Sequence, residues 1–332
     1  MAIKDSIFQP EEIGERTYKI IEESANDPQS GLSIGIPDVD RIMRPMRRGE
    51  FIGVLGYTSN YKTGFMNYVA RYNAKRINMI KSDKIVLSFL WEQSIEEQGL
   101  VDIMHSTARD GARINIQQIL DGRLNTDDLK RLHAASLERG ALPWWLIGHS
   151  ATQRKRQRMS MTDVAEATYH VMEVLEIKPA LIVIDYLQRI KREPAGTMRE
   201  AFMDIVDRIK DMALYAECPT IVASQAKRDV RHRKWALPRQ DDAQETSNFE
   251  QTSDKLFALW YCKQTKPDGE ELNIEGTSMG KRYGTLTVDD HLVILGLIKQ
   301  KFGIAPISFA LDVKPETNEI YAKTTLSDVQ QQ

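Results

Sequence analysis

The chain has 332 residues, of which 42% are hydrophobic and 28% are charged, as in an ordinary soluble globular protein with a sizeable core. Its 45 basic and 47 acidic residues give a formal net charge of -2, which excludes a strongly basic, histone-like protein. Basic residues that gather locally can still bind nucleic acid. Cys218 and Cys262 lie far apart and the six histidines lack a metal-binding spacing, so neither a disulfide framework nor a zinc site is expected.

The first thirty residues predict a helix and a linker before the main domain. Residues 11–26 carry a partial apolar face at helical spacing, and the turn-forming NDPQSG at 26–31 follows as a linker. The N-terminal MAIKDSIFQP lacks the apolar segment of a signal peptide, and no stretch approaches the roughly 18 apolar residues of a membrane span. We therefore expect a cytoplasmic protein without membrane contact, divided into a linker helix and linker, a motor-sized domain and a tail at 1–30, 31–325 and 326–332.

Between residues 31 and 325, apolar segments alternate with segments of helical periodicity, which predicts an α/β domain. The expected strands are 51–56, 84–90, 144–148, 180–187, 220–224, 256–262, 292–299 and 307–313. The expected helices are 62–77, 94–108, 124–139, 161–176 and 202–216. Continuous apolar strands between helices are typical of a mostly parallel, twisted sheet flanked by helices, and the last strands, which no helix separates, predict an antiparallel C-terminal edge. The polar, Gly-rich segment 264–290 is expected to be an inserted hairpin or loop.

The segment GYTSNYKT, from Gly56 to Thr63, follows an apolar strand and begins a helix, which is the context of a phosphate-binding loop. Backbone N–H groups at a helix N-terminus bind anions, Lys62 would reach the β- and γ-phosphates, and the Thr63 hydroxyl would bind Mg²⁺. Tyr61 stands where G-x-x-x-x-G-K-[ST] has its second glycine, so an ordinary strand–helix turn is the alternative. The candidate nucleotide-binding residues are Gly56, Ser59, Asn60, Tyr61, Lys62, Thr63 and Gly64.

Two carboxylates follow other predicted strands. Asp185 ends the apolar strand LIVID and suits the Mg²⁺ shell, although a strand-end Asp is also common as a helix cap. Glu92 in SFLWEQS would polarise the attacking water as a general base, against the alternative of a surface Glu that begins a helix. The order of Asp185 after the phosphate loop favours the metal interpretation.

Six segments, taken in order, resemble the motor domain of DnaB-like replicative helicases. They are GLSIGIPDVDRIMRPMRRGEFIGVLG, SFLWEQS, LIVIDYLQRI, TIVASQAKRDVRHR, DAQETSNFEQTSD and IKQKFG, and they span roughly residues 31–315. The resemblance implies a RecA-like P-loop NTPase core that uses ATP or another NTP with Mg²⁺. The minimal form and relaxed motifs suggest a phage or mobile-element type.

The resemblance also implies roles for individual residues. It keeps the phosphate loop and Asp185 in the roles given above and makes Glu92 the catalytic base. Gln225 would sense the γ-phosphate and link the nucleotide state to the DNA-facing loops. Lys299 and Lys301 would reach the nucleotide of a neighbouring subunit.

By the same resemblance, the segments after Asp185 and Gln225 would face DNA. Their composition agrees independently, because RIKREP (189–194) and KRDVRHRK (227–234) are locally basic and would hold phosphates without reading sequence. For each segment alone, a solvated charged face is an equal alternative, and for QRKRQR (153–158) such a face or a subunit contact is favoured. The candidate DNA-binding residues are Arg189, Lys191, Arg192, Lys227, Arg228, Arg231, Arg233, Gln244 and Glu245.

Three positions depart from the family pattern. Tyr61 replaces a glycine of the phosphate loop, and Gln244 replaces an arginine. Lys301 stands where the family has its arginine finger, and because lysine lacks the planar guanidinium fork, weaker activation across subunits is expected. Only the helix at 11–26 is expected before the motor domain. Ring assembly would therefore depend on contacts of that helix and on contacts between the motor domains themselves.

The leading interpretation is an ATP-dependent ring helicase on single-stranded DNA in replication, a homo-hexamer with nucleotide sites at subunit interfaces and a helicase loader or primase as partner. One alternative is a degenerate DnaB-like scaffold or regulator that binds nucleotide or DNA without efficient hydrolysis. Another is a recombinase- or KaiC-like ATPase. Retention of Glu92, Asp185 and Gln225 favours the active enzyme, because a scaffold has no physical need for that set.

Overall fold

The structure is a computed structural model, and the residues that it describes are 8–26, 31–109, 114–153, 158–193, 196–244, 248–275 and 282–325. Parts of several predicted features therefore lie outside the described residues. They are linker residues 27–30, residues 154–157 of the basic run, residue 194 of the first basic segment, Glu245, residues 276–281 of the Gly-rich segment and the tail 326–332.

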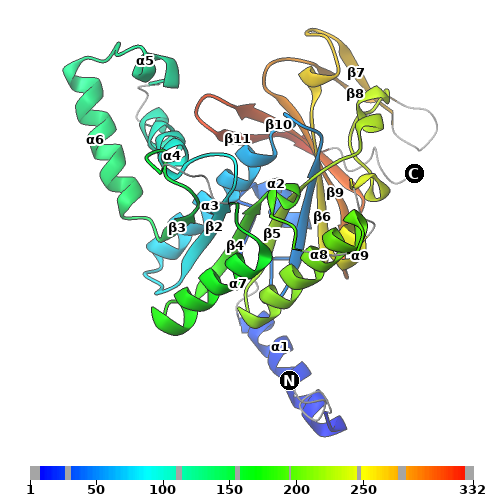
Figure 1. Cartoon of the computed structure of the whole chain (residues 1–332). Helices are drawn as coiled ribbons and strands as arrows, with labels where there is room; N and C mark the ends of the chain where they lie inside the picture. The colour runs from blue at the N-terminus through cyan, green and yellow to red at the C-terminus, as the bar shows by residue number, and fades with distance from the viewer. Residues whose placement is uncertain are drawn as a thin grey trace.

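In the described residues, nine strands form one sheet in the order β11-β10-β9-β6-β1-β5-β4-β2-β3 (Figure 1). Their bounds are β1 Phe51–Gly56, β2 Ile85–Leu90, β3 Trp144–Ile147, β4 Pro179–Asp185, β5 Thr220–Gln225, β6 Lys255–Tyr261, β9 Leu292–Gln300, β10 Ile307–Lys314 and β11 Glu319–Thr325. Strands β1 to β6 pair in parallel, and β9, β10 and β11 add antiparallel partners beyond β6. The predicted parallel sheet with an antiparallel C-terminal edge is confirmed.

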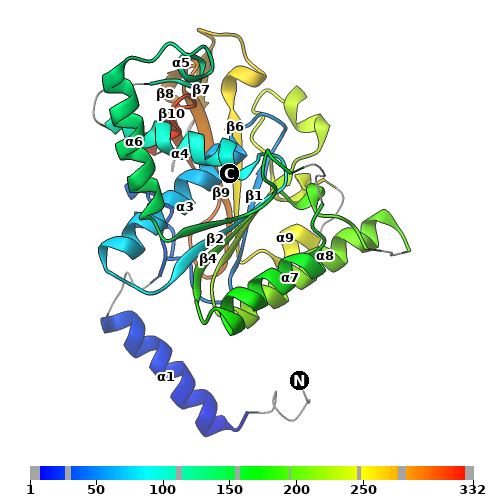
Figure 2. The same cartoon turned by 60° about the vertical axis from the view of Figure 1, so that its left-hand side comes forward.

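Helices cover both faces of the sheet (Figures 1 and 2). Their bounds are α1 Pro10–Asn26, α2 Pro37–Ile42, α3 Lys62–Met79, α4 Ile95–Arg109, α5 Ile116–Leu120, α6 Thr126–Gly140, α7 Met161–Tyr169, α8 Met198–Tyr215 and α9 Asn248–Thr252. Capping boxes mark where α5, α6, α7 and α8 begin. In α8, for example, Thr197 and Glu200 satisfy free N–H groups of the first turn, so the local sequence fixes the start of the helix.

The Gly-rich insertion contains a two-stranded antiparallel hairpin, which is one of the two forms expected for it. Its strands are β7 Glu271–Glu275 and β8 Arg282–Thr287. The hairpin forms a sheet of its own rather than extending the main one.

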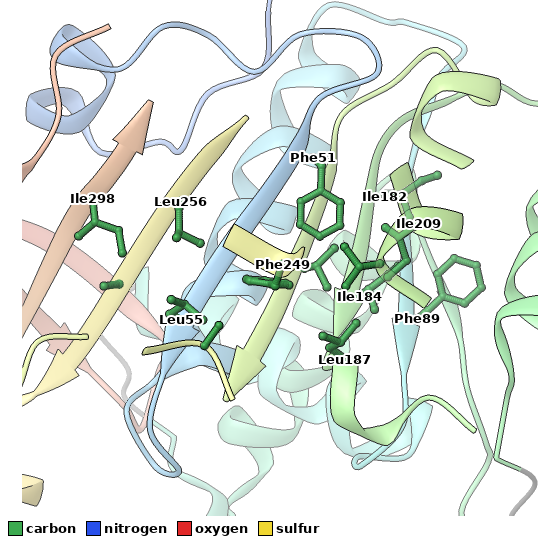
Figure 3. Close-up of a cluster of buried hydrophobic side chains, with 14 of the residues drawn as sticks. Phe51, Leu55, Phe89, Ile182, Ile184, Leu187, Ile209, Phe249, Leu256 and Ile298 are labelled. Atoms are coloured by element: carbon green, nitrogen blue, oxygen red, sulfur yellow. The ribbon is translucent and has the colours of Figure 1, made fainter. Parts of the chain in front are cut away.

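The core lies on both faces of the sheet because alternate residues of each strand point to opposite sides. On β1, Phe51 and Leu55 pack with α8 and α9 (Figure 3). Ile52 and Val54 pack against α3 on the other face. Phe249 of α9 meets the Phe51 ring edge-on, with 5.4 Å between the ring centroids. Burying each such side chain stabilises the fold by roughly 1.5–3 kcal/mol, which fixes the central strand beneath the site.

Helix α1 stands apart from the sheet and its covering helices in both views (Figures 1 and 2). Its apolar face, with Ile13, Ile20 and Ile21, is more than half exposed. Among the helices of the described chain, none combines the length and the apolar character that crossing a membrane requires.

Candidate nucleotide and nucleic-acid site

The carboxyl ends of the parallel strands bring the predicted site residues to one edge of the sheet. Gly56 at the end of β1 lies opposite Gln225 at the end of β5. Leu90 at the end of β2 lies opposite Asp185 at the end of β4, so Glu92 follows two residues beyond that pair. In open α/β sheets this edge is where ligands bind.

The phosphate loop follows β1 and ends at the first residue of α3. Ser59 and Tyr61 both adopt left-handed backbone conformations, with φ of 64° and 61°. The Lys62 ammonium donates to the carbonyls of Gly56, at 2.8 Å, and Tyr57, at 2.9 Å. Burial lowers the pKa of Lys62 to about 8, a shift that the carboxylates of Asp185 and Glu92 oppose. The lysine is therefore folded into the loop with its charge directed at the loop interior.

Gly56 and Asn60 shape the loop in different ways. A side chain at Gly56 would place its Cβ 2.9 Å from the Lys62 side chain, so glycine leaves room for the lysine to fold back. The buried Asn60 side chain accepts a 2.7 Å hydrogen bond from the backbone N–H of Tyr261, which ties the loop to the end of β6.

Tyr61 directs its side chain away from the loop interior. Its ring lies against Gly64, where an added Cβ would come within 2.5 Å of the ring. Its hydroxyl donates a 2.8 Å hydrogen bond to the side-chain oxygen of Asn318, in the turn between β10 and β11. A cleft of about 370 Å³ stays open beside the loop, lined by residues 58–64, Glu92, Tyr186, Gln225, Tyr261 and Pro315.

Thr63 and Asp185 form a pair that fits Mg²⁺. The Thr63 hydroxyl hydrogen bonds the Asp185 carboxylate, while Asp185 Oδ1 is buried without a hydrogen-bond partner among the described residues. Burial raises the pKa of Asp185, and the Thr63 hydroxyl and Lys62 oppose that shift. A buried carboxylate oxygen that lacks a donor next to a hydroxyl is the donor set that a hard cation accepts. These residues would hold Mg²⁺, which supplies charge neutralisation of the phosphates when bound.

Glu92 lines the cleft, and its side chain is partly exposed. Glu92 Oε1 accepts hydrogen bonds from the hydroxyl of Tyr186, at 3.3 Å, and from Nε of Arg189, at 2.9 Å. Gln225 lines the same cleft, and its backbone N–H donates to the side chain of Gln188 at 3.2 Å. The structure thus places the expected base and the expected γ-phosphate sensor on one cavity.

The first basic segment, 189–194, divides between the cleft and the surface. Arg189 pairs with Glu92, whereas Lys191 and Arg192 are exposed.

Several side chains of the second basic segment, 227–234, contact residues outside it. Arg228 and Arg231 are exposed, and the Arg231 guanidinium lies over the ring of Tyr57, 5.3 Å from its centroid. Arg233 forms a two-point ion pair with Asp242. The ammonium of Lys227 donates to the carbonyl of Asp241 at 2.6 Å.

These contacts brace the loop after β5, and Gln244 closes it with a 2.9 Å hydrogen bond from its backbone N–H to the carbonyl of Gln225. The backbone of Gln225 is therefore hydrogen-bonded to the far end of the loop that carries the second basic segment.

Lys299 lies near the end of β9 and Lys301 directly follows this strand, close to α9. The Lys299 ammonium donates to the carbonyls of Glu250, at 2.7 Å, and Gln251, at 3.1 Å. Lys301 is 59% exposed and lies 3.9 Å from the carboxylate of Asp254. Among the described residues that line the cleft of this chain, neither lysine is present.

Tyr186, Tyr261 and Asn318 were not predicted as site residues. Tyr186 follows β4 and Tyr261 is the last residue of β6, and both line the cleft. The sequence pattern of a buried strand does not distinguish an aromatic residue of the core from one that lines a cavity. Asn318 lies 257 residues from Tyr61 in sequence, and nothing local marks its contact.

The central β1, its phosphate loop and the carboxylates at neighbouring strand ends define a RecA-like P-loop domain. A family model described as the DnaB-like helicase C terminal domain matches residues 31–288, and the chain belongs to this family. A curated relative, the "Probable replicative DNA helicase" of Trieres chinensis, is 24% identical over 260 residues, which are 76% of this chain and 53% of that protein. The chain thus spans about half the length of this curated relative.

Two solved structures share the fold. A solved ATPase domain aligns with a TM-score of 0.74 at 19% identity, covering 93% of this chain and 98% of that chain. "The Structure Of A DnaB-Like Replicative Helicase And Its Interactions With Primase" aligns with a TM-score of 0.73 at 19% identity, covering 92% of this chain and 66% of that chain.

Proposed function

We propose that this chain is the motor of a replicative DNA helicase, which hydrolyses ATP with Mg²⁺ and moves along single-stranded DNA. The observation that carries the proposal is that Lys62, Thr63 and Glu92 line one open cleft at the edge of the sheet. The buried carboxylate of Asp185 lies next to this cleft, hydrogen-bonded to Thr63. Membership of the DnaB-like family supports the nucleic-acid substrate.

Each side chain has a defined task in this proposal. The Lys62 ammonium exchanges its loop carbonyls for phosphate oxygens, beside backbone N–H groups at the start of α3. Thr63 and Asp185 hold Mg²⁺. Glu92 accepts a proton from the attacking water. Gln225 senses the γ-phosphate and links the nucleotide state to the loop after β5, which Gln244 closes by its hydrogen bond to the Gln225 carbonyl.

The two basic segments supply the strand contact. Both follow strands whose ends border the cleft, and both would hold phosphates of the DNA backbone without reading its bases. Gln244 and Glu245 are proposed to bind DNA together with these segments. Lys299 and Lys301 would act on the nucleotide of a neighbouring subunit, for which the exposure of Lys301 is the support.

The direct test is hydrolysis of ATP by the purified chain, with and without single-stranded DNA. We expect stimulation by DNA and its loss in Lys62→Ala. Lys130→Ala, which removes an exposed lysine of α6, is the matched control and should behave as the unsubstituted chain. Nucleotide binding without turnover in the unsubstituted chain would favour a scaffold instead.

We further propose a homo-hexameric ring in which α1 of one copy docks on the next. The helix that carries this exposed apolar face has Glu11 and Glu12 in its first turn. A groove of about 1130 Å³ on the motor domain has apolar walls that include Met43, Pro45 and Tyr72. Its basic lining residues are Arg41, Arg44, Lys75 and Arg76. Apolar surface and opposite charge therefore match between helix and groove.

The ring is tested by measuring the mass of the particle in solution with nucleotide. Ile20→Asp combined with Ile21→Asp should dissociate it, because both side chains lie on the proposed docking face. Ile116→Asp, on α5, introduces the same charge at another exposed isoleucine and should leave the assembly intact. An open filament would favour a recombinase-like ATPase.

The proposed protein partner is a helicase loader or a primase, and the proposed compartment is the cytoplasm. The structural similarity to a DnaB-like helicase studied with primase supports this class of partner. A binding assay between the assembled ring and a purified primase tests it.

A further inference from the structure

Arg189 belongs to the first basic segment, yet its side chain reaches the catalytic cleft. Its Nε lies 2.9 Å from Glu92 Oε1, and its Nη2 contacts the same oxygen at 2.5 Å. Nε also lies 3.1 Å from the hydroxyl of Tyr186, which itself donates to Glu92. The guanidinium is 5.8 Å from the centroid of the Tyr186 ring. Three side chains thus form one cluster over the cleft.

This cluster opposes the use of Glu92 as a base. A carboxylate takes a proton from water through an oxygen lone pair, and Oε1 is already engaged by three donor contacts. While Arg189 and Tyr186 donate to Oε1, that oxygen is occupied and does not meet the attacking water.

The ion pair of Arg189 and Glu92 is accessible from solvent, so another anion can compete for Arg189. The side chains of Arg189 and Glu92 are 42% and 46% exposed, so water competes with the contact and its net strength is small. The buried pair of Arg71 and Asp102, with 3% and 1% exposure, has no such access. Lys191 and Arg192, two and three residues beyond Arg189, attract phosphates to the same segment.

We propose that Arg189 is the positioning residue that couples strand occupancy to hydrolysis: without DNA it holds Glu92, and a backbone phosphate of single-stranded DNA takes its guanidinium and releases the base. Arginine suits the exchange because its planar fork binds carboxylate and phosphate in similar geometry. The inference rests on the proposed function, and it deepens that function by naming the contact through which DNA stimulates the ATPase.

The test is Arg189→Gln, which removes the charge and retains a polar side chain of moderate length. We expect the DNA-free rate of ATP hydrolysis to rise about two- to fivefold, as for loss of an exposed ion pair. The ratio of the DNA-saturated rate to the DNA-free rate should fall toward one. Arg189→Lys should lie between the two proteins, because lysine keeps the charge but not the fork.

The matched control is Arg123→Gln, which breaks the exposed pair of Arg123 and Asp121 between α5 and α6. It should leave both rates unchanged. Thermal melting of all variants shows that each is folded.

The outcomes separate this inference from the proposed function. An unsubstituted chain that does not hydrolyse ATP overturns the motor itself. A DNA-stimulated chain whose Arg189→Gln variant keeps the same DNA-free rate and the same stimulation overturns the coupling alone. A fall in the DNA-free rate also overturns it, since Arg189 would then support Glu92 rather than restrain it.

Discussion

The hydroxyl of Tyr61 donates a 2.8 Å hydrogen bond to the side-chain oxygen of Asn318, and this contact joins the phosphate loop to the turn between β10 and β11. Asn318 is 3% exposed and has a φ of 54°, so the turn presents its amide in a fixed place. Burial raises the pKa of Tyr61, which keeps the phenol protonated and able to donate. The side chain that replaces the glycine of the loop motif is thereby anchored to the β10–β11 turn.

We expect Tyr61→Phe to lower both stability and nucleotide affinity. Loss of the hydrogen bond leaves the Asn318 oxygen without its donor, at a cost of about 1–2 kcal/mol. The left-handed loop loses its support, so the dissociation constant for ATP should rise severalfold, as measured by calorimetry.

Tyr68→Phe is the control, because the Tyr68 hydroxyl donates a comparable 2.8 Å hydrogen bond to the carbonyl of Gly35, away from the phosphate loop. It should reduce stability but leave nucleotide affinity unchanged. Equal nucleotide affinity in Tyr61→Phe and the unsubstituted chain would show that the Asn318 contact does not support the loop.

Gly64 and Tyr61 are expected to be energetically coupled. An alanine Cβ at Gly64 would lie 2.5 Å from the Tyr61 ring, which its hydroxyl contact prevents from moving freely. Gly64→Ala should therefore destabilise the chain by roughly 1–3 kcal/mol. In a Tyr61→Gly background the ring is gone and glycine accepts the left-handed conformation, so the same alanine should cost little.

The measurement is urea unfolding of the four proteins of this double-mutant cycle. Additive effects, with no coupling energy between the two positions, would contradict the packing of the ring on Gly64.

The sequence carries enough local information for the parallel sheet and the phosphate loop. The strand that ends at Asp185 is a continuous apolar run, and the loop motif combines a strand end, Lys62 and Thr63 within eight residues. Both signals are short-range, which is why they predict the element and its position. Strand β11, Glu319–Thr325, was not predicted, because its alternation of polar and apolar residues is weak and its partner β10 supplies the pairing.

Contacts between distant segments escaped prediction for a physical reason. Arg189 is expected to face DNA from the family resemblance and its basic neighbours, and neither can show that its side chain contacts Glu92, 97 residues away. Trp145 shows the same limit. A strand position predicts burial, yet at the edge strand β3 its side chain is 39% exposed, while Trp144 beside it is buried.

Asp185→Asn should separate activity from stability. The substitution keeps the shape of the side chain but removes the charge that would bind Mg²⁺, so ATP turnover should fall by roughly 100-fold or more. Because burial disfavours the carboxylate in the folded chain, the neutral amide should leave the melting temperature equal or higher. Nucleotide affinity should become insensitive to Mg²⁺ while affinity in EDTA stays the same. A variant that keeps its Mg²⁺ dependence would place the metal on other residues.

His105 also contacts the β10–β11 turn, and this contact predicts a dependence of stability on pH. Its Nδ1 lies 3.0 Å from the carbonyl of Thr317, so the neutral ring donates there. Burial, together with the positive charges of Arg71 and Lys75, lowers the pKa of His105 to about 3.

Between the ordinary histidine pKa of 6.5 and about 3, the unfolded chain binds a proton at His105 that the folded chain does not. The free energy of unfolding should therefore fall as the pH decreases from about 7 to about 4.5, by roughly 1–3 kcal/mol from this group. His105→Asn places an uncharged amide donor at the Nδ1 position and removes the titration, so its unfolding free energy should fall less over the same range. Denaturant unfolding of both proteins at about pH 7 and about pH 4.5 measures the difference. Parallel losses in the two proteins would place the acid sensitivity elsewhere.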